Sequence, residues 1–156
     1  PDRISFAPDS AAIDLVPVIP DEDPANYQRL VEGAWVTRHG GYYYLFYSGD
    51  NCCGPNAHYA VMVARSRAPT GPFETLAEAK GAPSSVILAQ DPRWIAPGHN
   101  AIITDEQGTS WILYHAVDAQ RPRSAATDEI NTRRVMLLGK VEWIDGWPRI
   151  HPLPAR

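Results

Sequence analysis

Short segments rich in aromatic and β-branched residues alternate with clusters of Gly, Pro, Asn and Asp along most of the chain. This pattern is typical of consecutive antiparallel strands joined by tight turns, and helical periodicity is scarce. It predicts two series of four short strands each. The first series comprises residues 34–37, 42–48, 59–66 and 71–75, and the second comprises 101–104, 110–115, 134–138 and a last strand combining 141–143 with 147–150.

The second series repeats the first. Trp35 aligns with Ile102, and Tyr47 with Tyr114, at a constant offset of 67 residues. The third strands align at the larger offset of 74, so the second copy carries an insertion in residues 117–132. Insertions of this kind are expected in loops.

Repeated four-stranded meanders are the unit of a β-propeller, whose blades stand around an axial channel. Residues 4–6 and 13–16 are expected to form strands of an earlier, incomplete blade. We therefore predict an all-β chain that is the C-terminal part of one propeller domain. Its predicted parts are a partial blade and connection in 1–30, one blade in 31–80 and the next blade in 97–150.

Composition excludes some partners. The 14 Lys and Arg against 18 Asp and Glu give a formal charge of −4, and no basic run is interleaved with aromatic residues, so nucleic acid is not expected to bind. No apolar stretch approaches the roughly 18 residues that cross a membrane. The chain starts at Pro1 without a Met or an apolar leader, which suggests a removed targeting segment or an excised piece.

The two cysteines, Cys52 and Cys53, are adjacent in the polar turn 49–56. Adjacent cysteines rarely reach disulfide geometry with each other. We therefore expect two free thiols packed in a loop, because free Cys behaves as a small buried hydrophobe. The spacing does not indicate a disulfide framework or a metal site.

The repeat places Glu32 and His99 at the same position of successive blades, just before the innermost strand. Glu32 lies among apolar and small residues, where desolvation would raise its pKa and keep it protonated, as a general acid requires. The alternative is an ordinary solvated carboxylate at a strand entry. For His99 the alternative is a structural histidine, and no HxxH or HxxxH spacing indicates a transition-metal site.

Other polar residues are weaker candidates. Asp50, Asp91, His115 and Asp118 lie at strand ends or turns, where Asp and His are common for conformational reasons. Aromatic side chains such as Trp35 could stack on a sugar, although blades also need large aromatics between sheets. The signatures of serine hydrolases, phosphate-binding loops and zinc proteases are missing, which leaves hydrolysis by carboxylates.

An ordered series of segments resembles glycoside hydrolase family 43 over nearly the whole chain from Glu32 onward. The resemblance implies a five-bladed propeller and an inverting enzyme that cleaves α-L-arabinofuranosyl or β-D-xylosyl linkages of plant cell-wall polysaccharides. The segments are 31–36, 41–49, 59–66, 71–73, 97–100, 111–116 and 143–148.

The resemblance also implies roles for individual residues. Glu32 matches the general acid, and His99 matches an axial histidine that helps to hold a hydrated calcium ion or lies near the sugar. Arg134 resembles an arginine near the substrate, and Trp35 is a further candidate for sugar contact. Calcium prefers oxygen ligands, so His99 would contribute only through a mostly water-coordinated site. No other cofactor is expected.

An inverting glycosidase also needs a general base roughly 6.5–9.5 Å from the acid. By the resemblance, this base and an aspartate that tunes the acid belong to earlier blades, and Asp2, Asp9 and Asp14 lack the expected strand context. We therefore expect an oligo- or polysaccharide as substrate, and either a complementing N-terminal half or a second copy as partner, since an unclosed propeller exposes strand edges. Polysaccharide substrates imply an extracellular or periplasmic location.

Two alternatives stay open. The blades could form a non-catalytic carbohydrate-binding or structural module, because fold does not determine function. The chain could also belong to a different furanosidase family with a similar five-bladed fold.

Overall fold

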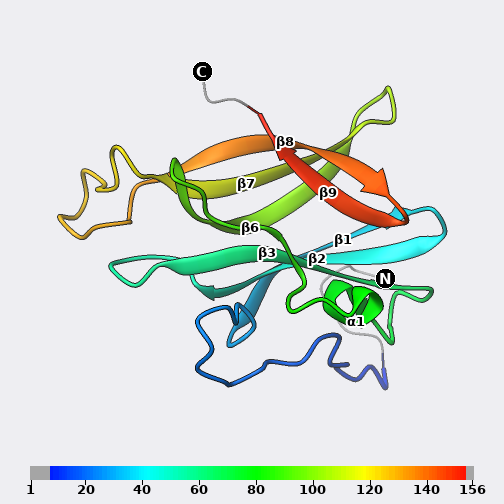
Figure 1. The fold of residues 1–156 in the computed structure, drawn as a ribbon. Coiled ribbons are helices and arrows are strands. Elements are labelled where there is room, and N and C mark those ends of the chain that lie inside the picture. The colour runs from blue at the N-terminus through cyan, green and yellow to red at the C-terminus, as the bar shows by residue number, and fades with distance from the viewer. Residues whose placement is uncertain (1–7, 154–156) are drawn as a thin grey trace.

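The computed structural model describes residues 8–153, which form two antiparallel sheets that lie face to face (Figure 1). Each sheet follows chain order, and in the first sheet both of the last two strands pair with β3. The first sheet contains β1 (Val31–His39), β2 (Tyr42–Asn51), β3 (His58–Ser66), β4 (Glu74–Thr75) and β5 (Val86–Leu88). The second contains β6 (Trp94–Thr104), β7 (Ser110–Asp118), β8 (Arg134–Ile144) and β9 (Trp147–Pro152). The prediction of an all-β, partial propeller is confirmed.

The core lies between the two sheets. Alternate side chains of each strand point to one face, so one side of the first sheet packs against one side of the second. Contact between blades is thus made by large apolar side chains that are almost fully buried. They include Tyr44, Phe46, Val61, Val63, Ile102, Ile112, Tyr114, Val141 and Trp147.

A second, smaller cluster covers the opposite face of the first sheet. Tyr47 and Met62 lie at its centre, and Leu15, Val16 and Tyr27 from the N-terminal segment pack against them. Figure 1 shows this segment, in blue, on the side of the first sheet away from the second. Residues 13–16 therefore pack as irregular chain, and the prediction that they form a strand is wrong. The strand predicted at 4–6 lies outside the described residues.

Several predicted strand limits are also wrong. Only Glu74–Thr75 pairs within the segment 71–75, and β5 takes a second place beside β3. β8 runs without interruption from Arg134 to Ile144, so residues 141–143 extend the third strand, and β9 alone is the fourth. Because the neighbouring strand is long, strand pairing continues through residues that the local sequence pattern assigns to a turn.

The one helix among the described residues, α1 (Leu76–Lys80), was not predicted. The Thr75 hydroxyl accepts a hydrogen bond from the Glu78 amide, and the Glu78 carboxylate accepts one from the Thr75 amide. This reciprocal arrangement is a capping box, and the sequence Thr-x-x-Glu is its signature. None of the helices in residues 8–153 is long and apolar enough to cross a membrane.

The repeat alignment is correct for the second strand of each sheet and one residue out for the first. Ser48 on β2 aligns with His115 on β7, but Ser48 pairs with Glu32 and His115 pairs with Gly98. Glu32 therefore corresponds to Gly98 rather than to His99. The same difference is present on the turn side of both bulges, where Trp35 pairs with Phe46 and Ala101 pairs with Leu113. Its cause is therefore the connection between these pairs, which is one residue longer from β6 to β7 than from β1 to β2.

Candidate functional site

The two sheets approach each other closely where β1 is bulged. Gly33 has a φ of +58°, in the left-handed region that glycine adopts readily. A Cβ at Gly33 would lie 3.2 Å from the Cα of His99. Glu32 therefore lies beside His99 within the strands themselves, not in turns that precede them.

Glu32 is exposed, so the enclosure expected from its apolar neighbours in sequence is not present in this chain. Its Oε1 atom accepts a hydrogen bond of 2.5 Å from the hydroxyl of Tyr59 on β3. No sequence pattern indicates this pair, because β3 is joined to β1 only through the intervening β2. Cross-strand placement brings the two side chains together.

Tyr59 is almost completely buried. Burial, and next the hydrogen bond to Glu32, raise the pKa of Tyr59 far above its usual value of 10.0. Its ring packs against Gly98, where a Cβ would be only 2.0 Å from the ring atom Cε1. The hydroxyl of Tyr59 is therefore a fixed donor at the edge of the site.

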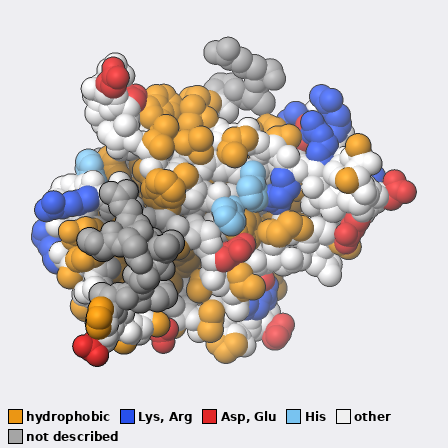
Figure 2. All heavy atoms as spheres, turned by 180° about the vertical axis from the view of Figure 1, so that it is seen from behind, with side chains coloured by type: hydrophobic (Ala, Val, Ile, Leu, Met, Phe, Trp, Pro, Cys, Tyr) orange, Lys and Arg blue, Asp and Glu red, His pale blue; other side chains and the backbone are white. Residues whose placement is uncertain are grey.

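His99 is held in an uncommon backbone conformation. Its φ is +52°, and its amide donates a hydrogen bond of 2.8 Å to Oγ of Ser48 in the other sheet. The His99 side chain is exposed, and its ring lies 5.8 Å, centroid to centroid, from the ring of His115. The backbone thus presents His99 outward beside Glu32. Figure 2 presents the molecule from behind the view of Figure 1, and histidine side chains lie near the middle of that face, beside basic and acidic side chains.

His115 and Arg134 form a second pair in the site. Nε of Arg134 donates to Nδ1 of His115 at 2.5 Å. Burial, then the positive charge of Arg134, then His99 lower the pKa of His115 from 6.5 to about 4. Because a guanidinium only donates, Nδ1 of His115 is the acceptor, and the neutral ring carries its proton on Nε2.

The guanidinium of Arg134 also joins the two sheets. Nη1 donates to the carbonyl of Cys52 at 2.5 Å, and Nη2 donates to the carbonyls of Ala96 and His115. Its centre lies 5.8 Å from the ring centroid of Tyr59. Arg134 thus lies beside Tyr59 and bonds to protein acceptors, and its contact with a sugar stays a prediction.

Trp35 lies beyond the bulge, opposite Phe46 on β2. Its side chain is 40% exposed. The structure therefore leaves part of the indole available, while sugar contact at this residue stays a prediction.

The described residues do not fit a calcium site by themselves. In residues 8–153 no group of three or more His, Cys, Asp or Glu side chains could hold a metal ion. His99 would supply one nitrogen ligand, whereas calcium takes six to eight oxygens. No catalytic step is assigned to calcium here.

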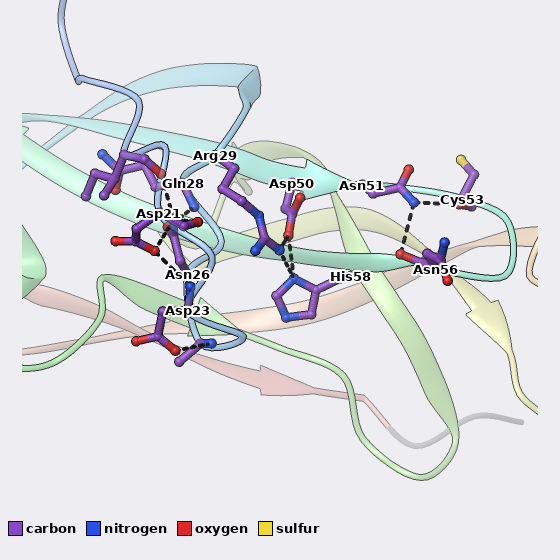
Figure 3. A network of polar contacts seen from close by, with 12 residues as sticks. Asp21, Asp23, Asn26, Gln28, Arg29, Asp50, Asn51, Cys53, Asn56 and His58 are labelled. Atoms are coloured by element: carbon purple, nitrogen blue, oxygen red, sulfur yellow. Dashed lines mark hydrogen bonds and ion pairs between the residues drawn. The ribbon is translucent and has the colours of Figure 1, made fainter.

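Cys52 and Cys53 are joined by a disulfide bond, so the expectation of free thiols is wrong. Their Cα atoms are 3.8 Å apart, below the usual range of about 4.4–6.8 Å for bridged cysteines. The turn between β2 and β3 accommodates the small ring. The Asn51 side chain stabilises this turn by donating to the carbonyls of Cys53 and Asn56 (Figure 3).

Asp50 lies at the end of β2, and it belongs to an ion-pair cluster. Arg29 donates to its carboxylate, and Nδ1 of His58 lies 2.5 Å from the same oxygen (Figure 3). Burial alone would raise the pKa of Asp50, but the hydrogen bonds from Arg29 and His58 outweigh it and lower the pKa below 3.8. This cluster links Arg29 of the N-terminal segment to Asp50 and His58 of the first sheet.

The other acidic candidates have structural roles. Asp91 accepts hydrogen bonds from the amides of Arg93 and Trp94, which is typical of a turn. Asp118 forms ion pairs with Arg93 and Arg133.

A cavity of about 310 Å³ lies away from Glu32, between the N-terminal segment and α1. Its lining includes Pro17, Gln28, Phe73 and Ser85. Gln28 and Ser85 are buried, and both are hydrogen-bonded within the chain. This cavity shares none of its lining with the Glu32 site.

Residues 14–148 match the family model of glycosyl hydrolases family 43. The chain belongs to this family. The family that the sequence resemblance predicted is thus confirmed, while the roles of Glu32 and His99 stay predictions.

Named relatives agree with this assignment. The probable arabinan endo-1,5-alpha-L-arabinosidase A of Aspergillus flavus is 28% identical, over 95% of this chain and 47% of its own length. The extracellular exo-alpha-(1->5)-L-arabinofuranosidase of Cellvibrio japonicus is also 28% identical, over 85% of this chain and 36% of its own length. The chain therefore spans half or less of the length of these curated relatives.

Solved structures show the same fold. The alpha-L-arabinanase of Cellvibrio cellulosa, in complex with arabinohexaose, matches with a TM-score of 0.64 and 28% identity. The match covers 78% of this chain and 36% of the arabinanase.

Proposed function

We propose that this chain supplies the C-terminal part of an inverting glycosidase, with Glu32 as the general acid. The substrate is an oligo- or polysaccharide with α-L-arabinofuranosyl or β-D-xylosyl linkages. The observation that carries the proposal is the position of Glu32. It is exposed at the meeting point of two family 43 blades, fixed by Tyr59 and flanked by His99.

The arrangement suits proton donation to a leaving group. Glu32 is reachable from solvent, while the groups around it are held by hydrogen bonds across both sheets. In this proposal the sugar hydroxyls contact His99, which is exposed, and the neighbouring His115. In this proposal the general base comes from outside the described residues, because the acidic candidates Asp50, Asp91 and Asp118 are engaged in ion pairs or turn hydrogen bonds.

The substrate class follows from the relatives. The family 43 proteins most similar in sequence include an endo-acting arabinan arabinosidase and an exo-acting arabinofuranosidase. An endo-1,4-beta-xylanase of Bacteroides thetaiotaomicron is 27% identical and matches with a TM-score of 0.59. We therefore place arabinan first and xylan second. An extracellular or periplasmic location follows from such substrates.

The outer face of the second sheet supports the proposal of a protein partner. Ile103, Met136 and Leu138 lie on its outer face, and Met136 is 70% exposed. Exposed apolar side chains on one face of a sheet are the kind of surface that a partner covers. We propose that the N-terminal blades cover this face, or a second copy when those blades are absent. A mass measurement in solution that finds only monomer would contradict pairing of copies.

Sugar release tests the catalytic proposal. The chain, alone and mixed with the separately expressed N-terminal blades of the A. flavus relative, is assayed on aryl α-L-arabinofuranoside and β-D-xyloside. We expect release that falls at least about 100-fold in Glu32→Gln, in line with the usual contribution of general acid catalysis. Glu106→Gln, which changes an exposed turn carboxylate, is the matched control.

Release that survives in Glu32→Gln contradicts the assignment of the acid. Absence of release in every mixture, with sugar binding retained in Glu32→Gln, favours the non-catalytic carbohydrate-binding alternative.

A further inference from the structure

We propose that Tyr59 is a positioning residue for the proton donor, which holds Glu32 so that Oε2 rather than Oε1 carries the proton to the substrate. This inference rests on the proposed function, because it assigns a role to Tyr59 at the same site. It concerns the orientation of the acid, which neither the sequence nor the family assignment addresses.

The contrast in burial between the two partners is the first support. Tyr59 is 1% exposed, whereas Glu32 is exposed. An exposed glutamate ordinarily samples several rotamers, because ordering it costs side-chain entropy. A bond of 2.5 Å to a rigid, buried hydroxyl selects one of these rotamers.

The fixed position of the Tyr59 ring is the second support. Gly98 of the second sheet leaves just enough room for it, since a Cβ there would lie 2.0 Å from Cε1 and 3.0 Å from Cζ. The guanidinium of Arg134 lies 5.8 Å from the ring centroid. Both blades therefore determine where the hydroxyl points.

The hydrogen-bond roles are also fixed. Tyr59 stays protonated at working pH, because burial and the neighbouring Glu32 raise its pKa. Its hydroxyl proton is directed at Oε1, which is therefore an acceptor in both states of Glu32. A protonated Glu32 has one O–H group, and Oε2 is the oxygen left to carry it.

Glu32 then donates its proton to the leaving group. The proton moves from Oε2 to the glycosidic oxygen, and the bond from the anomeric carbon to this oxygen breaks with its electron pair going to the oxygen. Water attacks the anomeric carbon and gives its proton to a second carboxylate. Glu32 is left ionised, and its bond from Tyr59 becomes charge-assisted, which is stronger than a neutral one.

The contact itself is tested by proton NMR of the 156-residue chain, without any need for turnover. A hydroxyl proton in a short bond to a carboxylate gives a downfield resonance. We expect this resonance in the wild type and in the control Tyr47→Phe, which removes another buried hydroxyl that bonds to Gln28. It is lost in Tyr59→Phe and moves upfield in Glu32→Gln. The proposal is overturned if Tyr59→Phe removes no such resonance or if Glu32→Gln leaves it unmoved.

The role in proton donation is tested by the dependence on leaving group. A good aryl leaving group departs with little protonation of the glycosidic oxygen, whereas an alkyl leaving group departs only when this oxygen is protonated. The assay uses this chain mixed with the N-terminal blades of the A. flavus relative. There, Tyr59→Phe is expected to lower kcat about tenfold on the alkyl substrate and little on the aryl substrate, with KM unchanged. Equal losses on both substrates indicate a merely structural role and overturn the proposal. If the wild type releases no sugar but shows the expected downfield resonance, the proposed function is wrong while the hydrogen bond from Tyr59 to Glu32 is confirmed.

Discussion

Gly98 on β6 lies so close to the ring of Tyr59 on β3 that no side chain fits between them. The pair joins the two blades at the position where Glu32 accepts the Tyr59 hydrogen bond. Packing between blades and orientation of the acid therefore depend on one small residue.

Gly98→Ala is expected to destabilise the chain. The added methyl group would overlap the Tyr59 ring, and overpacking of this kind costs about 1–3 kcal/mol. The free energy of unfolding in urea measures the loss. Thr104→Ala, at an exposed position of the same strand, is the control and should change stability by less than about 0.5 kcal/mol. An unchanged midpoint for Gly98→Ala would show that the blades do not meet at this residue.

The stability of the chain should depend on pH through His115. Its pKa is about 4 in the folded chain against 6.5 ordinarily. Between these values the unfolded chain binds more protons, so the free energy of unfolding falls as pH decreases from about 6.5 to about 4. Above that window His115 contributes no pH dependence.

The variant His115→Gln isolates this contribution, and its unfolding free energy should change less between pH 7 and pH 4.5 than that of the wild type. Asp50 does not interfere, because its lowered pKa contributes stability above about 3.8 that is lost only at more acidic pH. Identical pH profiles for the two chains would contradict the buried, neutral state of His115.

Arg134→Lys is expected to destabilise the chain, because an ammonium group cannot reproduce the forked contacts to Cys52, Ala96 and His115. Arg134 is half-buried, and loss of hydrogen bonds to such a charged group costs about 1–3 kcal/mol. Arg149→Lys, on the exposed side of β9, is the matched control. Thermal unfolding compares the two, and equal midpoints would show that Arg134 does not join the sheets.

The disulfide between Cys52 and Cys53 predicts a simple chemical result. The denatured, unreduced chain should contain no thiol that reacts with a thiol reagent, and reduction should release two for each chain. Reactive thiols before reduction would contradict the bond.

Sequence patterns predicted the sheets well, because alternation of apolar residues and turn residues determines antiparallel meanders. They failed at the connection between β6 and β7, which is one residue longer between equivalent pairs than the connection between β1 and β2. A single offset for both strands therefore places the counterpart of Glu32 one residue too far along the chain. Tyr59 was missed for a different reason, since its contact with Glu32 crosses from β3 to β1.

The error at the cysteines had a different origin. General geometry argues against a bond between neighbours, and only the conformation of the particular turn overrides it. The Thr75 and Glu78 capping box, in contrast, was visible in the sequence, and a search for Thr-x-x-Glu would have found α1.

The roles proposed for Glu32, His99 and His115 all require that a sugar binds beside them. Arabinotriose is therefore added to the isotope-labelled chain, and the NMR resonances of the backbone and the histidine side chains are followed. We predict that the perturbed resonances centre on Glu32, His99 and His115. Perturbation centred on the cavity lined by Gln28 and Phe73, or none at millimolar sugar, would contradict these roles.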